Sequence, residues 1–247
     1  MAEWFDGFFD GIYANVLANT FDERRTARHV RIVKRLLKLR RGQSALDVPC
    51  GMGRLTIPLA RMGLDMTGVD LTPLYIRRAR RAAKKEGLPV RFIQSDMRAI
   101  DFDGEFHGAL NWFGSFGYFS DAENLAFARQ VFRALRPGGR FLIDGINKSW
   151  ILSHFRPRSD EMRGRVRVQT ESKWNARKGR VVSTWTLTKG AKTERLRVDM
   201  WIFNGADIRR LLRAAGFREI ELYGYEPLGR LSRHTRRIIA VGRRPRT

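Results

Sequence analysis

Hydrophobic positions in the first 150 residues follow two different spacings. Short apolar runs, such as "SALDV" at 44–48 and "MTGVD" at 66–70, have the length and composition of buried strands. Longer stretches place apolar residues three and four apart, which predicts helices; in 24–39 the residues at 27, 30, 33, 36 and 37 share one helical face. The chain therefore switches repeatedly between strand and helix.

Five strand-like runs are separated by helical stretches over residues 44–146. The runs lie at 44–48, 66–70, 90–94, 107–112 and 140–146. Capping signals mark the helices between them: Thr72 and Pro73 begin one that ends before Gly87, and Ser120 with Glu123 forms a capping box for another. Such alternation predicts a parallel, doubly wound α/β sheet whose strands all end at one edge, where ligands bind.

The pattern changes after residue 150. Three alternating runs, 163–174, 180–187 and 194–203, are joined by polar turns that contain Gly179 and Gly190. They predict a small antiparallel sheet, in whose first run Arg163, Arg165 and Arg167 share a face. Residues 204–247 again show the helix and strand patterns of the first 150 residues. They predict a helix capped by Asn204 and Asp207, followed by two closing strands. We therefore expect a Rossmann-like sheet of seven strands with an antiparallel β insertion after strand five.

Composition narrows the class of protein. The 247 residues hold one cysteine and four histidines, which excludes an internal disulfide framework and gives no metal-ligand spacing. No apolar run reaches the roughly 18 residues needed to span a bilayer, and the acidic N-terminus is unlike a signal peptide. We expect a cytoplasmic, metal-free protein, a monomer or homodimer, with no membrane partner.

Net charge is unusually high at +23, and residues 151–247 carry +15 of it. A basic surface attracts phosphates, nucleic acid or acidic lipid, whereas an arginine-rich solvated face explains the same composition without any partner. The second explanation is favoured, so nucleic acid is the less favoured partner.

The segment "LDVPCGMGR" at 46–54 joins the first strand to the following helix. Dinucleotide loops need G-x-G-x-x-G, and neither register fits: position 49 is proline and position 56 is threonine. What remains is Asp47 at the strand end, the pair Gly51 and Gly53, and Asp70 at the end of strand two. A carboxylate at Asp70 is suited to both hydroxyls of a ribose, although one acid after a strand is as often a helix cap.

Further motifs appear in a fixed order along the chain. They are "TGVDLT" with the downstream "AR", "SDMR" at 95–98, "GSFGYFSD" at 114–121, "LRPGGRFLID" at 135–144 and "NGADIRRLLRAAGFREIELYG" at 204–224. Together with the glycine turn this set resembles the class I S-adenosylmethionine-dependent methyltransferases. It is most similar to a family of small-molecule methyltransferases in which proline often replaces the first glycine.

That resemblance implies S-adenosyl-L-methionine as the cofactor and assigns roles to particular residues. Gly51 and Gly53 approach the methionine end of the cofactor, Asp47 organises the loop, and Asp70 holds the ribose. Other residues would cover the adenine (Asp96, Met97), lie beside the sulfonium (Asn111, Trp112) or belong to the lid (Tyr13). For Tyr13, packing in an aromatic core with Phe8 and Phe9 is an equally favoured interpretation. The full cofactor-binding set is Tyr13, Asp47, Pro49, Gly51, Gly53, Arg54, Asp70, Leu71, Asp96, Met97, Asn111 and Trp112.

The resemblance also divides the chain into four segments. Residues 1–43 form an N-terminal helical lid and 44–150 the cofactor-binding core. Residues 151–203 form the β insertion that covers the substrate, and 204–247 complete the core sheet.

No catalytic residue is assigned. His154, His234 and Tyr118 are candidates for a base, needed only if the acceptor arrives protonated, and Asp121 is better placed in the first turn of a helix. Cys50 follows strand one, not strand four as the nucleophile of cytosine-5 methyltransferases does, and is rejected as a nucleophile.

We expect methyl transfer to a small-molecule acceptor, and the basic charge is compatible with an anionic one. RNA or another polyanion gripped by the C-terminal region is the runner-up. A cofactor-binding protein without catalysis is a third possibility. A nicotinamide dehydrogenase would have to bind its cofactor without the third glycine.

Overall fold

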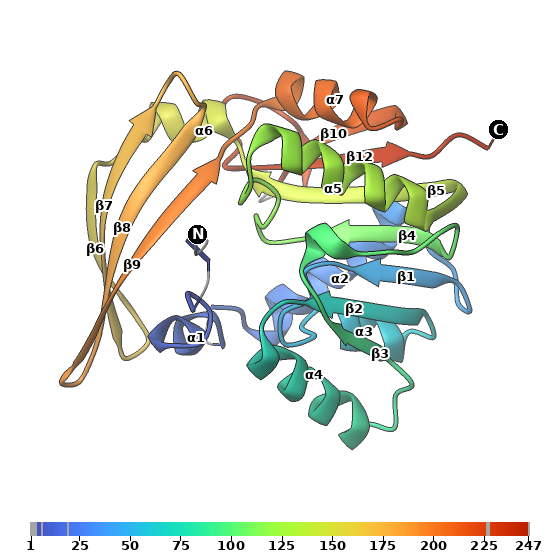
Figure 1. Ribbon diagram of the computed structural model, residues 1–247, viewed down its shortest axis with the longest axis horizontal. Helices are drawn as coiled ribbons and strands as arrows, with labels where there is room; N and C mark the ends of the chain where they lie inside the picture. The colour runs from blue at the N-terminus through green and yellow to red at the C-terminus, as the bar shows by residue number, and fades with distance from the viewer. Residues whose placement is uncertain (1–3, 6, 19, 226–227, 247) are drawn as a thin grey trace.

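The computed structural model describes residues 4–5, 7–18, 20–225 and 228–246, and its strands form two sheets (Figure 1). The larger sheet has the strand order β11-β10-β12-β5-β4-β1-β2-β3. Its strands are β1 (Ser44–Asp47), β2 (Asp65–Asp70), β3 (Arg91–Gln94), β4 (Phe106–Asn111), β5 (Leu135–Ile146), β10 (Arg218–Tyr225), β11 (Gly229–Arg230) and β12 (Arg237–Arg243).

Helices cover both faces of this sheet. The helices of the described residues are α1 (Ile12–Ala18), α2 (Glu23–Leu37), α3 (Thr56–Arg61), α4 (Pro73–Lys85), α5 (Asp121–Ala134), α6 (Lys148–Ser153) and α7 (Gly205–Ala214), with a 3₁₀ turn at Met97–Ala99. One hydrophobic cluster joins α5 and α7 to the sheet, and a second joins α2 and α3 to it. The expected α/β class is confirmed.

Strands β1 to β5 run parallel, so their carboxyl ends share one edge. Asp47 pairs in register with Leu110 of β4 and with Gly68 of β2, and Asp70 pairs with Gln94 of β3. The sequence order of these strands therefore brings the residues that follow β1, β2, β3 and β4 to the same place.

The closing strands differ from expectation in one detail. β12 lies between β5 and β10 and runs antiparallel to both, which confirms the closing pair. A two-residue strand, β11, adds an eighth member at the edge beyond β10. A strand of two residues is too short to carry an alternating pattern, so no sequence signal predicts it.

The predicted antiparallel sheet has four strands rather than three: β6 (Arg158–Arg163), β7 (Val166–Asn175), β8 (Arg180–Lys189) and β9 (Lys192–Trp201). β6 was missed because none of its residues is buried, so no apolar alternation marks it. Arg163 consequently ends β6 and pairs with Val166 across a turn, which corrects its expected place on one strand with Arg165 and Arg167.

Several local predictions are confirmed by side-chain contacts. Ser120 and Glu123 form the capping box of α5, and Asn204 and Asp207 form that of α7. Pro73 occupies the first turn of α4, where its missing N–H costs nothing.

Helix α1 packs on the four-stranded sheet, whereas Phe5 before it belongs to the core cluster of the larger sheet. Ile12 and Val16 of α1 share a cluster with Val166, Val168 and Leu187. In Figure 1 this segment lies between the four-stranded sheet and the parallel strands. It therefore stands above the edge where the parallel strands end.

Candidate functional site

A cavity of about 800 Å³ opens at the carboxyl edge of the parallel strands. Ten of the twelve predicted cofactor residues line it: Tyr13, Asp47, Pro49, Gly51, Arg54, Asp70, Leu71, Asp96, Met97 and Trp112. Gly53 and Asn111 do not belong to the lining. The cavity falls within the roughly 300–1,000 Å³ that small-molecule sites occupy.

Asp70 is held rigidly at the end of β2. Its Oδ2 accepts a hydrogen bond from the Gly51 backbone N–H at 2.8 Å, and its Oδ1 accepts one from the Thr72 N–H at 2.9 Å. Burial raises the pKa of this carboxyl, and the two backbone hydrogen bonds oppose that rise. Each oxygen keeps a further lone pair, so the oriented carboxylate can accept hydrogen bonds from a ligand.

The two glycines of the turn serve different purposes. Both adopt left-handed backbone conformations, Gly51 at φ 56° and Gly53 at φ 80°. A Cβ on Gly53 would lie 3.0 Å from Ile57, whereas one on Gly51 would meet no atom within 4 Å. Gly53 is therefore needed for packing, and Gly51 leaves space on the cavity side for a ligand to approach the backbone.

Asp47 lies beneath the turn and is fully buried. Its Oδ2 accepts a hydrogen bond of 2.6 Å from the Thr56 hydroxyl at the start of α3. Burial raises the pKa of Asp47 to about 7, against the lowering effects of the Thr56 bond and of Arg54. The contact ties β1 to α3, which fits the predicted role of organising the loop.

The end of β3 presents Asp96 and Met97. Asp96 begins the 3₁₀ turn, and its carboxylate accepts hydrogen bonds from the backbone and guanidinium of Arg98. Asn111, at the end of β4, donates to the Val48 carbonyl at 2.8 Å and is completely buried. Its position beside a sulfonium remains a prediction, as do the adenine contacts.

His29 contacts both Arg54 and Trp112, which lie in the wall of the cavity. The Nδ1 atom of His29 lies 3.0 Å from Arg54 Nη1 and 3.2 Å from Trp112 Nε1. Both neighbours are donors, so Nδ1 accepts and the ring proton lies on Nε2. Burial, reinforced by nearby arginines, lowers the pKa of His29 to about 3. The imidazole is thus neutral and orients both side chains.

The Arg54 guanidinium has no ion-pair partner among the described residues. It lies 3.9 Å from the centroid of the Phe21 ring, and burial lowers its pKa to about 10. A desolvated cation in a cavity wall is stabilised by an anionic ligand group.

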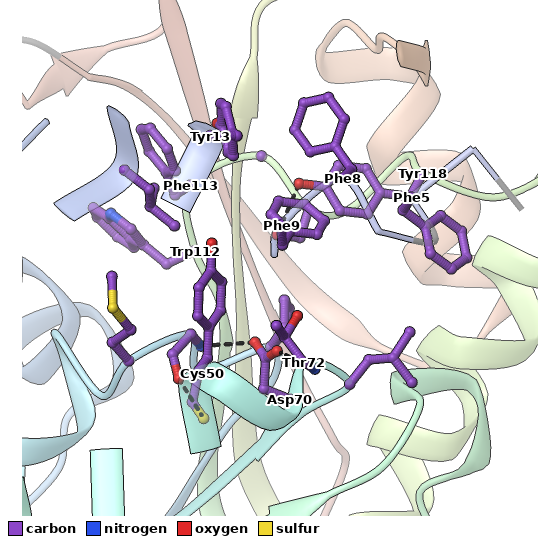
Figure 2. A pocket seen from close by; sticks show the side chains of 18 of the residues that line it. Phe5, Phe8, Phe9, Tyr13, Cys50, Asp70, Thr72, Trp112, Phe113 and Tyr118 are labelled. Atoms are coloured by element: carbon purple, nitrogen blue, oxygen red, sulfur yellow. Dashed lines mark hydrogen bonds between the residues drawn. The ribbon is translucent and has the colours of Figure 1, made fainter. Parts of the chain in front are cut away.

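Aromatic side chains form the roof of the cavity. Figure 2 shows Phe5, Phe8, Phe9 and Tyr118 facing Asp70 and Thr72 across the cavity, with Tyr13, Phe113 and Trp112 at the side. Trp4 fixes the roof to the loop after β4, because its Nε1 donates to the Tyr118 carbonyl at 3.2 Å. Phe116 of the same loop is instead a core residue, 2% exposed.

Sequence reasoning missed Tyr75 in the first turn of α4. Its side chain is 2% exposed and lines the cavity, and its hydroxyl has no hydrogen-bond partner among the described residues. Burial raises its pKa, so the phenol is neutral. Its place in the first turn of the helix that follows Asp70 was the available signal. An unpaired buried hydroxyl is costly, and a ligand in the cavity would satisfy it.

Only one of the three candidate bases lies at the cavity. Tyr118 lines the cavity, whereas His154, at the end of α6, and His234, in the exposed turn before β12, do not. Burial raises the pKa of Tyr118, which keeps its phenol protonated. Asp121 lies in the first turn of α5, as expected.

Cys50 lines the cavity, but burial raises its pKa well above the ordinary value, so the thiol stays protonated. Within the described ranges, no group of three or more His, Cys, Asp or Glu side chains is arranged to hold a metal ion. Across that same part of the chain, no helix has both the length and the apolar character to cross a membrane.

Comparison with known proteins agrees with this geometry. Residues 45–139 match the family model described as a methyltransferase domain, which is less than half of the chain. A demethylmenaquinone methyltransferase of Thermus thermophilus is 37% identical over 101 residues, 40% of this chain and 44% of that protein. The ubiquinone biosynthesis O-methyltransferase of a Methylobacterium species is 32% identical over 108 residues, 44% of this chain and 43% of that protein. The matched segment thus spans less than half of these relatives.

Solved structures extend the likeness to the whole chain at the level of fold. An S-adenosylmethionine-dependent methyltransferase from Clostridium acetobutylicum superposes with a TM-score of 0.79 at 17% identity, covering 97% of this chain and 98% of that one. The amino pentose methyltransferase CalS10 from Micromonospora echinaspora, solved with S-adenosylmethionine bound, has a TM-score of 0.65 at 18% identity, covering 94% and 96%. The fold is that of S-adenosylmethionine-dependent methyltransferases.

Proposed function

We propose that this protein is an S-adenosylmethionine-dependent methyltransferase that acts on a small-molecule acceptor. The observation that carries the proposal is the Asp70 carboxylate, fixed by the Gly51 and Thr72 backbone N–H groups in the lining of a cavity roofed by aromatic rings. The methyltransferase domain match over 45–139 and the fold support it. The proline form of the loop further favours the small-molecule family.

The residues present fit this cofactor. Asp70 would accept hydrogen bonds from the two ribose hydroxyls. Gly51 would let the cofactor approach the backbone closely, because it has no side chain. Met97 and Leu71 would cover the adenine. The Arg54 guanidinium, which has no carboxylate partner among the described residues, is suited to the methionine carboxylate. The Tyr75 hydroxyl supplies one more hydrogen-bonding group.

When bound, S-adenosylmethionine supplies an electrophilic methyl group on a sulfonium. The aromatic roof stabilises positive charge through ring faces and excludes water from the cavity. Tyr118, with its raised pKa, is suited to donate a hydrogen bond rather than to remove a proton. Catalysis therefore rests chiefly on holding the acceptor in line, which alone supplies several kcal/mol.

The acceptor is proposed to enter from the side of β6–β9, whose Val198 and Met200 line the cavity. A single buried cysteine suits a reducing compartment, so we place the protein in the cytoplasm.

Calorimetric titration with S-adenosylmethionine tests the cofactor, using Asp70→Asn and the matched control Asp65→Asn from the exposed start of the same strand. We expect Asp70→Asn to weaken binding at least about tenfold, and Asp65→Asn to bind like the unaltered protein. Transfer of a labelled methyl group to a metabolite extract, with an RNA pool in parallel, tests the reaction. Unchanged binding by Asp70→Asn, or labelling confined to RNA, would contradict the proposal.

A further inference from the structure

Charged side chains are divided between two walls of the cavity. On the side of the glycine turn and the N-terminal segment, one cation, Arg54, is accompanied by four acids: Asp10, Asp47, Asp70 and Asp96. The facing wall is built from β6–β9 and the start of β12, which Figure 1 shows away from β2 and β3. It contributes three arginines and, within the described lining, no acid: Arg163, Arg236 and Arg237.

Two of these arginines are neutralised within the protein. Arg237 forms a two-point ion pair with the buried Asp144, and Arg163 pairs with Glu161 at 2.5 Å. The Arg237 charge is thus neutralised in a buried pair, whereas the Arg163 charge is shared with Glu161 in an exposed one.

Arg236 differs from both. No carboxylate of the described residues pairs with it, and its guanidinium lies 5.4 Å from the centroid of the Trp150 ring. Stacking on a ring face leaves the N–H donors at the edge of the guanidinium available to a ligand.

Hydrogen bonds from Asn147 hold the backbone around Arg236 in place. Asn147 is 2% exposed, and its Nδ2 donates to the carbonyls of Ser232 at 2.9 Å and Thr235 at 2.8 Å. The Asn147 N–H also donates to the Arg236 carbonyl at 3.0 Å. Such anchoring lowers the entropy lost when Arg236 binds a ligand.

Apolar side chains adjoin this charge. Phe113 lies 5.6 Å from the Arg237 guanidinium and packs edge-on against Phe21 at 4.6 Å between ring centroids. Ile146, Val198 and Met200 complete the same side of the lining. The wall thus combines one available cation with an apolar surface, inside a cavity of small-molecule size.

We propose that the methyl acceptor is a small amphipathic anion, whose carboxylate or phosphate group pairs with Arg236 and whose apolar body lies against Phe113 and Met200. This inference rests on the proposed function and names the substrate class of the same site. It assigns Arg236 as a specificity-determining residue.

The test uses protein loaded with S-adenosylhomocysteine and three probes that share one ring system: 2-naphthoate, 2-naphthyl phosphate and the uncharged 2-naphthamide. Arg236→Gln removes the cation and Arg236→Lys retains it. Arg233→Gln is the matched control, since Arg233 is exposed in the same turn and lies outside the cavity. Binding is measured by titration calorimetry, after each variant is shown to bind S-adenosylhomocysteine.

We expect the charged probes to bind at least about tenfold more tightly than the amide. Arg236→Gln should abolish that preference, Arg236→Lys should keep part of it, and Arg233→Gln should keep all of it. The better of the two charged probes identifies carboxylate or phosphate as the preferred group.

Equal binding of charged and neutral probes, or a preference that survives Arg236→Gln, would overturn the inference. So would displacement of the naphthoate by a mixed-sequence RNA oligonucleotide in a salt-sensitive, Arg236-dependent manner, because the wall would then serve a polyanion. Failure of the unaltered protein to bind S-adenosylhomocysteine would instead overturn the proposed function itself.

Discussion

The guanidinium of Arg237 donates two hydrogen bonds to the carboxylate of Asp144, from Nε at 2.8 Å and from Nη2 at 2.6 Å. The same carboxylate accepts the backbone N–H of Phe113 at 2.9 Å. Phe113 has φ 73°, a left-handed conformation that a bulky residue rarely adopts. The pair thus joins β5 and β12 to the loop after β4 and holds Phe113 in the cavity wall.

Asp144→Ala should lower the free energy of unfolding by about 3–5 kcal/mol, because it leaves the Arg237 charge buried without a partner. Asp144→Asn should cost less, since its amide oxygen still accepts the Phe113 N–H. Urea denaturation followed by fluorescence measures both. Asp101→Ala is the control, because the Asp101 side chain is 89% exposed in its pair with Arg133 and should matter little. Equal losses for Asp144→Ala and Asp101→Ala would contradict this account.

Gly51→Ala should abolish most cofactor binding. The new methyl group would occupy the open space beside the turn, and the left-handed backbone adds a strain of roughly 1–2 kcal/mol. Gly42→Ala carries similar backbone strain at φ 80°, also with open space around the new Cβ, but lies outside the cavity. Titration with S-adenosylmethionine should therefore separate the two variants, which lose similar stability. Similar binding by both would show that nothing approaches Gly51.

Tyr75→Phe should leave the melting temperature of the ligand-free protein unchanged or higher, because it removes an unpaired buried hydroxyl. The same change should reduce the rise in melting temperature produced by S-adenosylmethionine. Thermal scans with and without the cofactor measure both effects. Tyr223→Phe is the comparison, since the Tyr223 hydroxyl bonds to Glu221 away from the cavity. A full cofactor shift in Tyr75→Phe would mean that the hydroxyl meets no ligand atom.

Asp47 should give stability a distinctive pH dependence. Burial raises its pKa to about 7, whereas an unfolded aspartate titrates near about 4. The folded protein therefore binds more protons across that window, and the stability this group contributes falls as pH rises from about 4 to about 7. Above about pH 7 the loss is complete.

Asp47→Asn removes this titration, so the unfolding free energy of the variant relative to the unaltered protein should rise over the same window by a few kcal/mol and then level off. Urea denaturation at a series of pH values measures the difference. His29, with its pKa lowered to about 3, has the opposite slope between about pH 3 and pH 6.5 in both proteins and cancels. A pH-independent difference would show that Asp47 stays ionised throughout.

Much of the site followed from local sequence. Asp47 and Asp70 end strands of recognisable βα units and Asp96 lies just after one, and parallel strands place their ends at one edge whatever the details of packing. Capping boxes at Ser120 and Asn204 were predictable because their partners lie three residues away.

Contacts between distant segments were not predictable. Glu194 of β9 accepts the Ile12 N–H at 2.7 Å at the start of α1, which has no acid in its own first turn. The sequence around each of these residues has no pattern that predicts a contact across 182 positions. Strand β6 was not predicted because none of its residues is buried, and so it has no apolar alternation.

The sequence by itself determined the α/β fold and the sheet edge at which the candidate site lies. Both follow from local patterns, namely the alternation of strands with helices and the glycine turn. Only the tertiary structure decided which arginines keep an available charge. Arg236 and Arg237 are neighbours of one residue type, and only Arg237 finds a buried carboxylate, on a strand 93 positions away. Electrostatic pairing depends on distance in space, which the order of residues does not state.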